Sequence, residues 1–238
     1  MNNQFSILYE DRELAVLIKA PGVLSQKDAS RDPDLLSLLS LHYAEKRESR
    51  EVFAVHRLDR GVGGVMVVAR SKRMAAQLSA EIADHDAFSK CYLAVVHGAL
   101  PQPSASLVDY LYHDERARRT QRADKDDPRG KRAELSFRVL SERDVSESKR
   151  LSLVLVRLHT GRTHQIRAQF SFCGHPLAGD RRYGAKDRYG EIALFSCALS
   201  FVHPTTKKRL TFRALPGESS AFREFSLSDE IFERSMPD

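Results

Sequence analysis

An apolar run, Val52 to Val55, leads into His56-Arg57-Leu58-Asp59-Arg60 and the glycine-rich turn Gly61-Val62-Gly63-Gly64. A second apolar run, Val65 to Ala69, follows directly. We predict that both runs are strands, and the second, apolar at every position, suits burial on both faces of a sheet. The segment between the strands therefore presents one carboxylate, that of Asp59, between two arginines at a glycine turn.

Similar short apolar runs, separated by polar turns, occupy much of the remaining chain. We expect further strands at residues 7–9, 14–18, 90–96, 133–140, 151–158, 195–201 and 209–213. Helical periodicity predicts three helices. The first begins at Asp32-Pro33, the second runs from a capping Ser71 to near His85, and the third runs from Thr163 to Cys173. Strands outnumber helices and do not alternate with them, so we predict an α+β fold with a mostly antiparallel sheet and flanking helices.

No linker divides the sequence, and we expect a single domain covering residues 1–238. Residues 101–132 have the least regular pattern, and we predict a charged excursion there, as a long hairpin or a surface loop. This excursion carries three closely spaced arginines, Arg118, Arg119 and Arg122.

Composition narrows the class of protein. The 238 residues are 42% hydrophobic, enough for a packed core, and carry a formal net charge of +6, which favours a polyanion such as nucleic acid as partner. Cys91, Cys173 and Cys197 lie far apart, without a C-x-x-C pair. We recognise neither a secretory leader nor an apolar run long enough to span a bilayer, and therefore expect a cytoplasmic protein with free thiols.

Asp59 is the first candidate for chemistry. A strand can hold it in place, while the following glycines let a ligand approach the backbone. Arg57 and Arg60 would favour its ionised form. Such a carboxylate can act as nucleophile, as base or as stabiliser of positive charge on a sugar. The alternative is a structural aspartate that pairs with an arginine and caps the turn.

A second basic segment is His159-Thr160-Gly161-Arg162-Thr163-His164-Gln165-Ile166-Arg167. We expect a helix to start near Gly161 and Thr163, and its free N–H groups would form an anion site. Of Arg162 and Arg167, one could bind phosphate while the other pairs with a buried carboxylate, because a guanidinium can bond both carboxylate oxygens at once. A solvated basic helix face is the alternative.

Tyr92 lies in the predicted strand at residues 90–96. Its ring could stack on a base while its hydroxyl stays available, and the alternative is an ordinary core tyrosine. Histidines 56, 159 and 164 lie in two distant segments without the spacing of metal ligands, so we expect no metal site. The glycines at 61, 63 and 64 match no phosphate-loop pattern.

Together these segments resemble the RluA-type RNA pseudouridine synthases, from about Ile7 to about Leu215. Three motifs carry the resemblance: His56-Arg57-Leu58-Asp59 before a glycine turn, Lys90-Cys91-Tyr92-Leu93-Ala94, and Thr160 to Arg167 continuing to Gly174-His175-Pro176-Leu177-Ala178-Gly179-Asp180 and Tyr183-Gly184. The resemblance implies a central mixed, mostly antiparallel sheet with a catalytic cleft, no cofactor, and isomerisation of uridine to pseudouridine in ribosomal or transfer RNA.

The resemblance also implies roles for individual residues. Asp59 would be the catalytic aspartate, and Arg167 would pair with it. Tyr92 would contact the target base and help to remove the proton from its C5, while Arg57 would enter the base stack. The residues that we expect to contact RNA are Arg57, Arg60, Arg118, Arg119, Arg122, Arg162, His164 and Gln165.

One departure from the family pattern lies beside Asp59. The family usually has a threonine and a serine where this chain has Val62 and Gly63, so two hydroxyls that could hold the loop are lost. Many relatives also carry an N-terminal RNA-binding module, which we do not find here, so the catalytic domain, acting as a monomer, would bind RNA itself. Two alternatives stay open: a nucleoside hydrolase or base glycosylase, and a non-catalytic RNA-binding or RNA-chaperone protein that keeps the fold.

Overall fold

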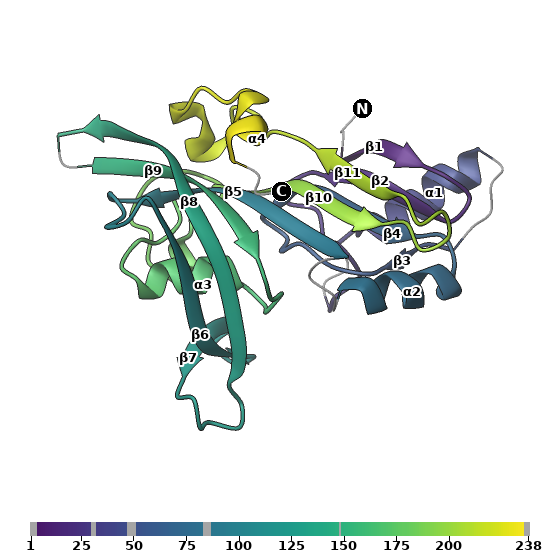
Figure 1. The fold of residues 1–238 in the computed structure, drawn as a ribbon, viewed down its shortest axis with the longest axis horizontal. Coiled ribbons are helices and arrows are strands. Elements are labelled where there is room, and N and C mark those ends of the chain that lie inside the picture. Colours follow the sequence, from purple (N-terminus) through teal and green to yellow (C-terminus); the bar gives the residue numbers. More distant parts are fainter. Residues whose placement is uncertain (1–3, 30–31, 47–50, 83–86, 148, 236–238) are drawn as a thin grey trace. The chain divides into compact units, whose positions relative to one another are not determined.

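The computed structural model describes residues 4–29, 32–46, 51–82, 87–147 and 149–235 (Figure 1). They form two compact units. The first unit comprises residues 1–90 and 195–214, and the second comprises residues 91–194 and 215–238. That residues 1–238 act as one domain stays a prediction.

The first unit is built on a mixed sheet. Its strands are β1 (Phe5–Glu10), β2 (Leu14–Lys19), β3 (Phe53–Ala54), β4 (Gly63–Ala69), β10 (Leu194–Val202) and β11 (Arg209–Arg213). They are ordered β1-β2-β4-β10, with β3 paired to β4 and β11 paired to β10. The β4–β10 pair is parallel, and the other pairs, β1–β2, β2–β4, β3–β4 and β10–β11, are antiparallel. The predicted strand at residues 52–55 is thus only two residues long.

Two helices complete the first unit, α1 (Leu35–Glu45) and α2 (Lys72–Ile82). α1 begins later than predicted, because the buried carboxylate of Asp34, not Asp32, accepts the N–H groups of the first turn. Ser71 caps α2 as predicted, with its Oγ 3.1 Å from the backbone nitrogen of Met74. The predicted end of this helix, near His85, lies outside the described residues.

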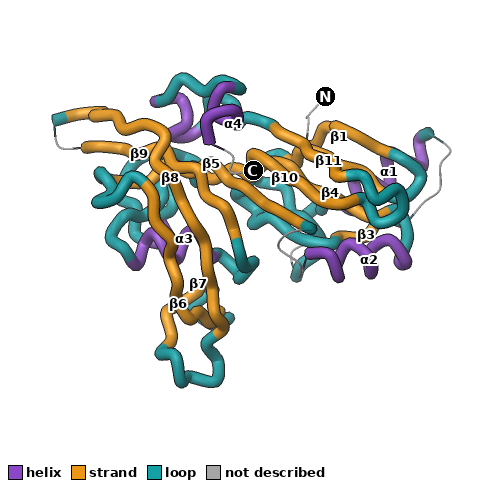
Figure 2. The backbone as a smooth tube through the Cα atoms, in the orientation of Figure 1, coloured by secondary structure: helices purple, strands orange, loops and turns teal. Residues whose placement is uncertain are grey.

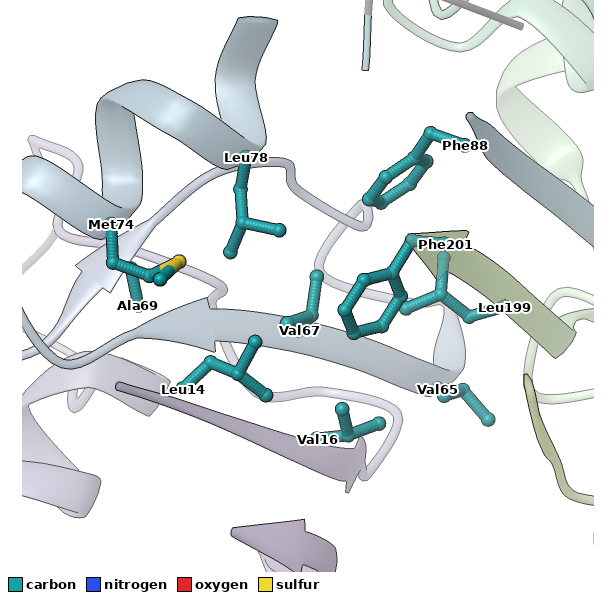
Figure 3. Packing of buried hydrophobic residues seen from close by; sticks show 10 residues of the cluster. All are labelled: Leu14, Val16, Val65, Val67, Ala69, Met74, Leu78, Phe88, Leu199 and Phe201. Atoms are coloured by element: carbon teal, nitrogen blue, oxygen red, sulfur yellow. The ribbon is translucent and has the colours of Figure 1, made fainter. Parts of the chain in front are cut away.

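The core of the first unit lies between α2 and the sheet (Figure 3). Alternate residues of β2 and β4 contribute to it, as expected for strands whose side chains point to opposite faces in turn. Phe88 and Phe201 stack on each other at 5.8 Å between ring centroids. The cluster consists of Leu14, Val16, Val65, Val67, Ala69, Met74, Leu78, Phe88, Leu199 and Phe201.

The second unit is dominated by long strands. They are β5 (Phe88–His97, which begins in the first unit), β6 (Ser104–Asp114), β7 (Arg119–Ala123), β8 (Lys131–Ser146) and β9 (Lys149–Leu158). Their order is β5-β9-β8-β6-β7, with antiparallel pairing of β6 with β7, β6 with β8, and β8 with β9. The charged excursion predicted at residues 101–132 is therefore a regular hairpin, β6–β7, continued by β8 (Figure 2).

Short helices lie beside these strands: α3 (Gln165–Phe172), α4 (Glu230–Ser235) and the 3-10 turns Arg181–Tyr183 and Ser220–Glu224. α3 packs on one face of the sheet, where Phe170 contacts Phe137 of β8 at 5.4 Å between ring centroids. Sequence periodicity did not predict α4 or the 3-10 turns, which are shorter than two full helical turns.

Candidate active site

Asp59 lies in the loop between β3 and β4 and is partly exposed. The preceding residue, Leu58, is buried with 4% of its surface exposed. The backbone N–H of Val62 donates to the Asp59 carbonyl at 3.0 Å and closes the turn. A buried residue thus precedes the carboxylate and a tight turn follows it, whereas the strand that we expected directly before Asp59 ends at Ala54.

A buried lysine lies beside this loop. The side chain of Lys19 at the end of β2 is fully buried, and its Nζ lies 2.7 Å from the Val23 carbonyl, 3.0 Å from the Ala20 carbonyl and 3.3 Å from the Arg60 carbonyl. Burial lowers the pKa of Lys19 to about 8, while attraction to Asp59 acts in the opposite direction. Asp59 therefore has a buried cationic neighbour in its own unit, which sequence analysis missed.

His56 anchors the start of the same loop. Its Nε2 accepts the backbone N–H of Val67 in β4 at 3.1 Å, and its ring lies edge-on to Phe88. Burial, together with the nearby cation of Lys90, lowers the pKa of His56 to about 3. A neutral imidazole is also what the bond requires, because Nε2 must present a lone pair. His56 is thus a structural acceptor on the loop.

The arginines on either side of Asp59 differ in their surroundings. Arg57 is exposed. Arg60 pairs with Asp32 at 2.7 Å, and its Nε donates to the Gly22 carbonyl at 3.1 Å, while its side chain is about half exposed. Arg60 therefore ties the loop that carries Asp59 to residues 22 and 32. A role of either arginine in RNA binding stays a prediction.

Close contacts in the glycine turn explain why position 63 carries no side chain. A Cβ on Gly63 would lie 2.9 Å from Cδ of Pro21 and 3.1 Å from the Lys19 carbonyl. Gly64 has a φ of +125°, and a Cβ there would lie 2.3 Å from the carbonyl oxygen of Ser196 in β10. Val62 is buried with 2% exposure. The two glycines are thus required by close neighbours, Pro21 at one position and β10 at the other.

Another hydroxyl holds the loop instead. Ser25, which is 4% exposed, donates from its Oγ to the Leu58 carbonyl at 2.7 Å. The same Oγ accepts the Leu58 backbone N–H at 3.0 Å. The peptide groups on both sides of Leu58 are therefore fixed by one side chain that lies 33 residues away in the sequence.

In the second unit, Arg167 forms a two-point ion pair with Asp180. Its Nε lies 2.6 Å from Oδ2 and its Nη2 lies 2.9 Å from Oδ1, and both side chains are almost completely buried. This confirms that one arginine of the basic segment pairs with a buried carboxylate. The pairing of Arg167 with Asp59 joins residues of different units and stays a prediction.

α3 begins at Gln165, two residues later than predicted, because His164 adopts a left-handed conformation with a φ of 53°. The predicted anion site at Thr163 is therefore not at the helix start. The Gln165 side chain is buried and holds the preceding loop, since its Oε1 accepts from Thr160 and from the Arg162 N–H. Its Nε2 donates to the Glu134 carbonyl, so a direct contact of Gln165 with RNA would require these bonds to break.

Tyr92 lies in β5 and is 6% exposed. Its neighbour Cys91 lines a groove of about 300 Å³ to which Ser136, Arg138 and Leu155 also contribute. Side chains alternate along a strand, and Phe137 points to the other face, where it contacts α3. Tyr92 therefore points to the α3 face, the same face on which Arg167 is held.

Tyr183 is the centre of a further cluster that sequence analysis missed. Its hydroxyl accepts the Thr120 N–H at 2.7 Å and lies 3.0 Å from Nδ1 of His164. The guanidinium carbons of Arg119 and Arg167 lie 5.2 Å and 4.9 Å from its ring centroid. Tyr183 thus connects the β6–β7 hairpin with α3. It contacts three basic side chains of the predicted site, those of Arg119, His164 and Arg167.

The remaining arginines of the predicted RNA surface also have contacts within the unit. Arg122 pairs with Asp109 at 2.8 Å and lies 5.0 Å from the ring centroid of Phe172 in α3. Nε of Arg162 donates to the Arg132 carbonyl at 3.0 Å. Arg118 has a φ of 50° at the tip of the β6–β7 hairpin. These side chains are exposed or partly exposed and lie along the hairpin and the loop before α3.

The three cysteines are free, as predicted, and Cys173 is the exposed one. Over the described ranges from residue 4 to residue 235, no helix is both long and apolar enough to cross a bilayer.

Known proteins resemble the chain over most of its length. A family model described as RNA pseudouridylate synthase matches residues 13–172. The uncharacterized RNA pseudouridine synthase YjbO of Bacillus subtilis is 34% identical over 219 residues, which cover 90% of this chain and 74% of YjbO. Ribosomal large subunit pseudouridine synthase D of Zymomonas mobilis is 34% identical over 224 residues, 87% of this chain and 68% of that protein.

The fold is shared with a solved structure, human RNA pseudouridylate synthase domain containing 1. The TM-score is 0.75 at 22% identity, with 98% of this chain and 96% of the human chain covered. This likeness confirms the predicted fold class. The family match and the two bacterial relatives show that the chain belongs to the RNA pseudouridylate synthase family, whose members are isomerases that convert uridine to pseudouridine in RNA.

Proposed function

We propose that this chain isomerises specific uridines of structured ribosomal RNA, with Asp59 acting directly on the target nucleotide. Family membership supports the reaction, and relatives named as ribosomal large subunit pseudouridine synthases support the substrate. The observation that carries the role of Asp59 is its setting: a partly exposed carboxylate on a loop whose backbone is held by the buried side chains of Lys19 and Ser25. The partly buried His56 ties the start of the loop to β4. Because each predicted site residue can come from one copy, we expect a monomer.

The reaction needs no cofactor, because it is an internal rearrangement. The bond between N1 and C1′ breaks, a bond between C5 and C1′ forms, C5 loses a proton and N1 gains one. Asp59 would attack the sugar or the base, or take a proton from the ribose, and all three roles require an ionised carboxylate. Tyr92 would line the base pocket and help to remove the C5 proton, and Arg167, oriented by Asp180, would stabilise Asp59.

The target uridine must leave its stack before the glycosidic bond is accessible, which costs a few kcal/mol. Arg57, exposed beside Asp59, would fill the vacated position. Arg60, Arg162 and His164 would contact the strand, and so would the hairpin arginines at 118, 119 and 122. The cation–π contacts of Arg119 with Tyr183 and of Arg122 with Phe172 support this role, because they hold the two guanidinium groups in place in the second unit.

Pseudouridine mapping in total RNA, with and without this protein, tests the proposal. We expect one or a few ribosomal uridines to lose their modification in the deletion strain and to regain it with the wild-type gene but not with Asp59→Asn. A loss of pseudouridine confined to transfer RNA would contradict ribosomal RNA as the substrate and leave the proposed reaction unchanged. An unchanged map in every RNA would contradict the proposed function.

A further inference from the structure

Three polar side chains hold the loop that carries Asp59: buried Lys19 and Ser25 from outside the loop, and partly buried His56 from near its start. Lys19 bonds the Arg60 carbonyl, His56 bonds the Val67 N–H, and Ser25 bonds both the N–H and the carbonyl of Leu58. Of the three, Ser25 acts closest to Asp59, because the Leu58 carbonyl belongs to the peptide group that also contains the Asp59 nitrogen.

The two bonds of Ser25 act on adjacent peptide planes. The Leu58 N–H lies in the plane before Leu58, and the Leu58 carbonyl lies in the plane after it. Fixing both planes restricts φ and ψ of Leu58, and with them the direction in which the chain enters Asp59. On the other side, the Arg60 carbonyl is held by Lys19 and by the Gly22 N–H at 2.8 Å.

Ser25 is well suited to this task. It lies directly after the bridge between Leu24 and Asp34 and is 4% exposed, so its hydroxyl is shielded from water. Its Oγ also lies 3.7 Å from Sδ of Met66 in β4, which restricts the rotamer from the side of the sheet. A hydroxyl is both donor and acceptor, whereas a methyl or a thioether group could not satisfy both peptide groups of Leu58.

We propose that Ser25 is a positioning residue for the carboxylate of Asp59. Its hydroxyl anchors the loop in place of the two hydroxyls that positions 62 and 63 lack. The proposal rests on the proposed role of Asp59. Ser25 does not touch the substrate. It acts on rate through the placement of Asp59, since a displacement of about 1 Å in a reacting group can cost about 100-fold in rate.

The departure at Gly63 then has a structural explanation. The Cβ of a serine at 63 would press against Pro21, so this position cannot carry an anchoring hydroxyl without rearrangement. The anchor is contributed by the segment after Pro21 instead. The same segment that excludes a side chain at position 63 therefore provides the replacement bond from Ser25.

The test uses single-turnover tritium release from 5-tritiated uridine in RNA, measured over a range of enzyme concentrations. We expect Ser25→Ala to lower the maximal rate constant by about 10- to 100-fold, with half-saturation unchanged within about twofold. Ser25→Thr and Ser25→Val have nearly the same shape and differ in the hydroxyl. The rate constant of the Thr variant should be at least about tenfold higher than that of the Val variant, because only threonine keeps the hydroxyl that bonds Leu58.

Ser37→Ala is the matched control. Ser37 also uses its hydroxyl in the first unit, donating to Asp34 at 2.6 Å, but it does so at the cap of α1. This variant should keep the wild-type rate constant. A wild-type rate in Ser25→Ala, or equal rates in the Thr and Val variants, would overturn the proposal.

Amide hydrogen exchange at Leu58 separates this proposal from the proposed function. We expect exchange at Leu58 to be at least about tenfold faster in Ser25→Ala than in the wild type, because the N–H loses its buried acceptor, while exchange in β4 stays unchanged. This readout does not require activity. If wild-type protein released no tritium from any RNA, the proposed function would fail, and the exchange result would still show whether Ser25 holds the loop. Unchanged exchange at Leu58 would overturn the positioning role.

Discussion

Arg167 and Asp180 form a buried ion pair in which two guanidinium nitrogens bond two carboxylate oxygens, at 2.6 Å and 2.9 Å. The pair joins α3 to the loop after it and fixes the plane of the guanidinium group. Nε bonds Oδ2 of Asp180 and Nη2 bonds Oδ1. An arginine that is held in this way needs little reorganisation when charge develops beside it, which suits a stabilising role in catalysis.

Removing the charge of Asp180 should be costly. Asp180→Asn leaves the buried Arg167 cation without its counter-ion, and we expect the free energy of unfolding to fall by about 3–5 kcal/mol. Asp144→Asn is the matched control, because Asp144 also pairs with an arginine, Arg150, but on the surface. Urea denaturation should show a large shift for the first variant and almost none for the second. Similar small shifts in both would contradict the structural role of the pair.

The close approach at Gly64 gives a second prediction. Gly64→Ala and Gly174→Ala both place a side chain at positive φ, which costs about 1–2 kcal/mol. Only at Gly64 does the new Cβ also meet backbone, that of Ser196, and overpacking adds about 1–3 kcal/mol. Thermal and urea unfolding should therefore rank Gly64→Ala as clearly less stable than Gly174→Ala. Equal stabilities would show that β10 does not approach the turn as described.

Pro21 and Gly63 should be coupled. Gly63→Ser alone brings a Cβ to 2.9 Å from the rigid proline ring, and we expect about 1–3 kcal/mol of destabilisation. In the Pro21→Ala background the ring carbons are absent, so Gly63→Ser should destabilise the protein by at least about 1 kcal/mol less than it does in the wild type. A double-mutant cycle measured by urea denaturation gives this coupling. Strictly additive effects would mean that Pro21 is not what excludes a side chain at position 63.

The buried Lys19 predicts a pH dependence of stability. Because the pKa of Lys19 is about 8 in the folded chain and 10.5 when unperturbed, the unfolded chain binds more protons between these values. The contribution of Lys19 to the free energy of unfolding should therefore rise by on the order of 3 kcal/mol between pH 8 and pH 10.5. Below pH 8 this contribution should stay level. In Lys19→Met this contribution should be absent from the urea unfolding profile.

Asp59→Asn provides the matching test of proximity. The attraction of Asp59 raises the pKa of Lys19, so its removal should lower that pKa and move the rise in stability to lower pH. Profiles of wild type and Asp59→Asn that rise over the same pH range would show that Lys19 and Asp59 do not interact.

Local patterns in the sequence predicted the strands and the fold class well. The continuous apolar runs of β2 and β4 identify buried strands. The basic segment predicted that Arg162 or Arg167 pairs with a buried carboxylate, and Arg167 does. The β6–β7 hairpin was harder to predict, because most of its side chains are polar and only Leu111 and Thr120 are buried. Its regularity comes from backbone pairing with β8, which leaves little trace in composition.

The side chains that hold the Asp59 loop could not be predicted from local patterns. Lys19 and Ser25 reach the loop through bonds to backbone atoms, and backbone acceptors have no sequence signature. Likewise, the late start of α3 follows from the left-handed conformation of His164, and nothing in the residue type requires it. Such contacts depend on how distant segments fold together, which is the step that periodicity does not describe.

The most direct measurement of the central claim is tritium release from 5-tritiated uridine in ribosomal RNA by wild-type protein and by Asp59→Asn, with RNA binding followed in parallel. The account predicts release without free uracil for the wild type, and no release with RNA binding retained for Asp59→Asn. Full activity of Asp59→Asn, or free uracil as the product of the wild type, would contradict it.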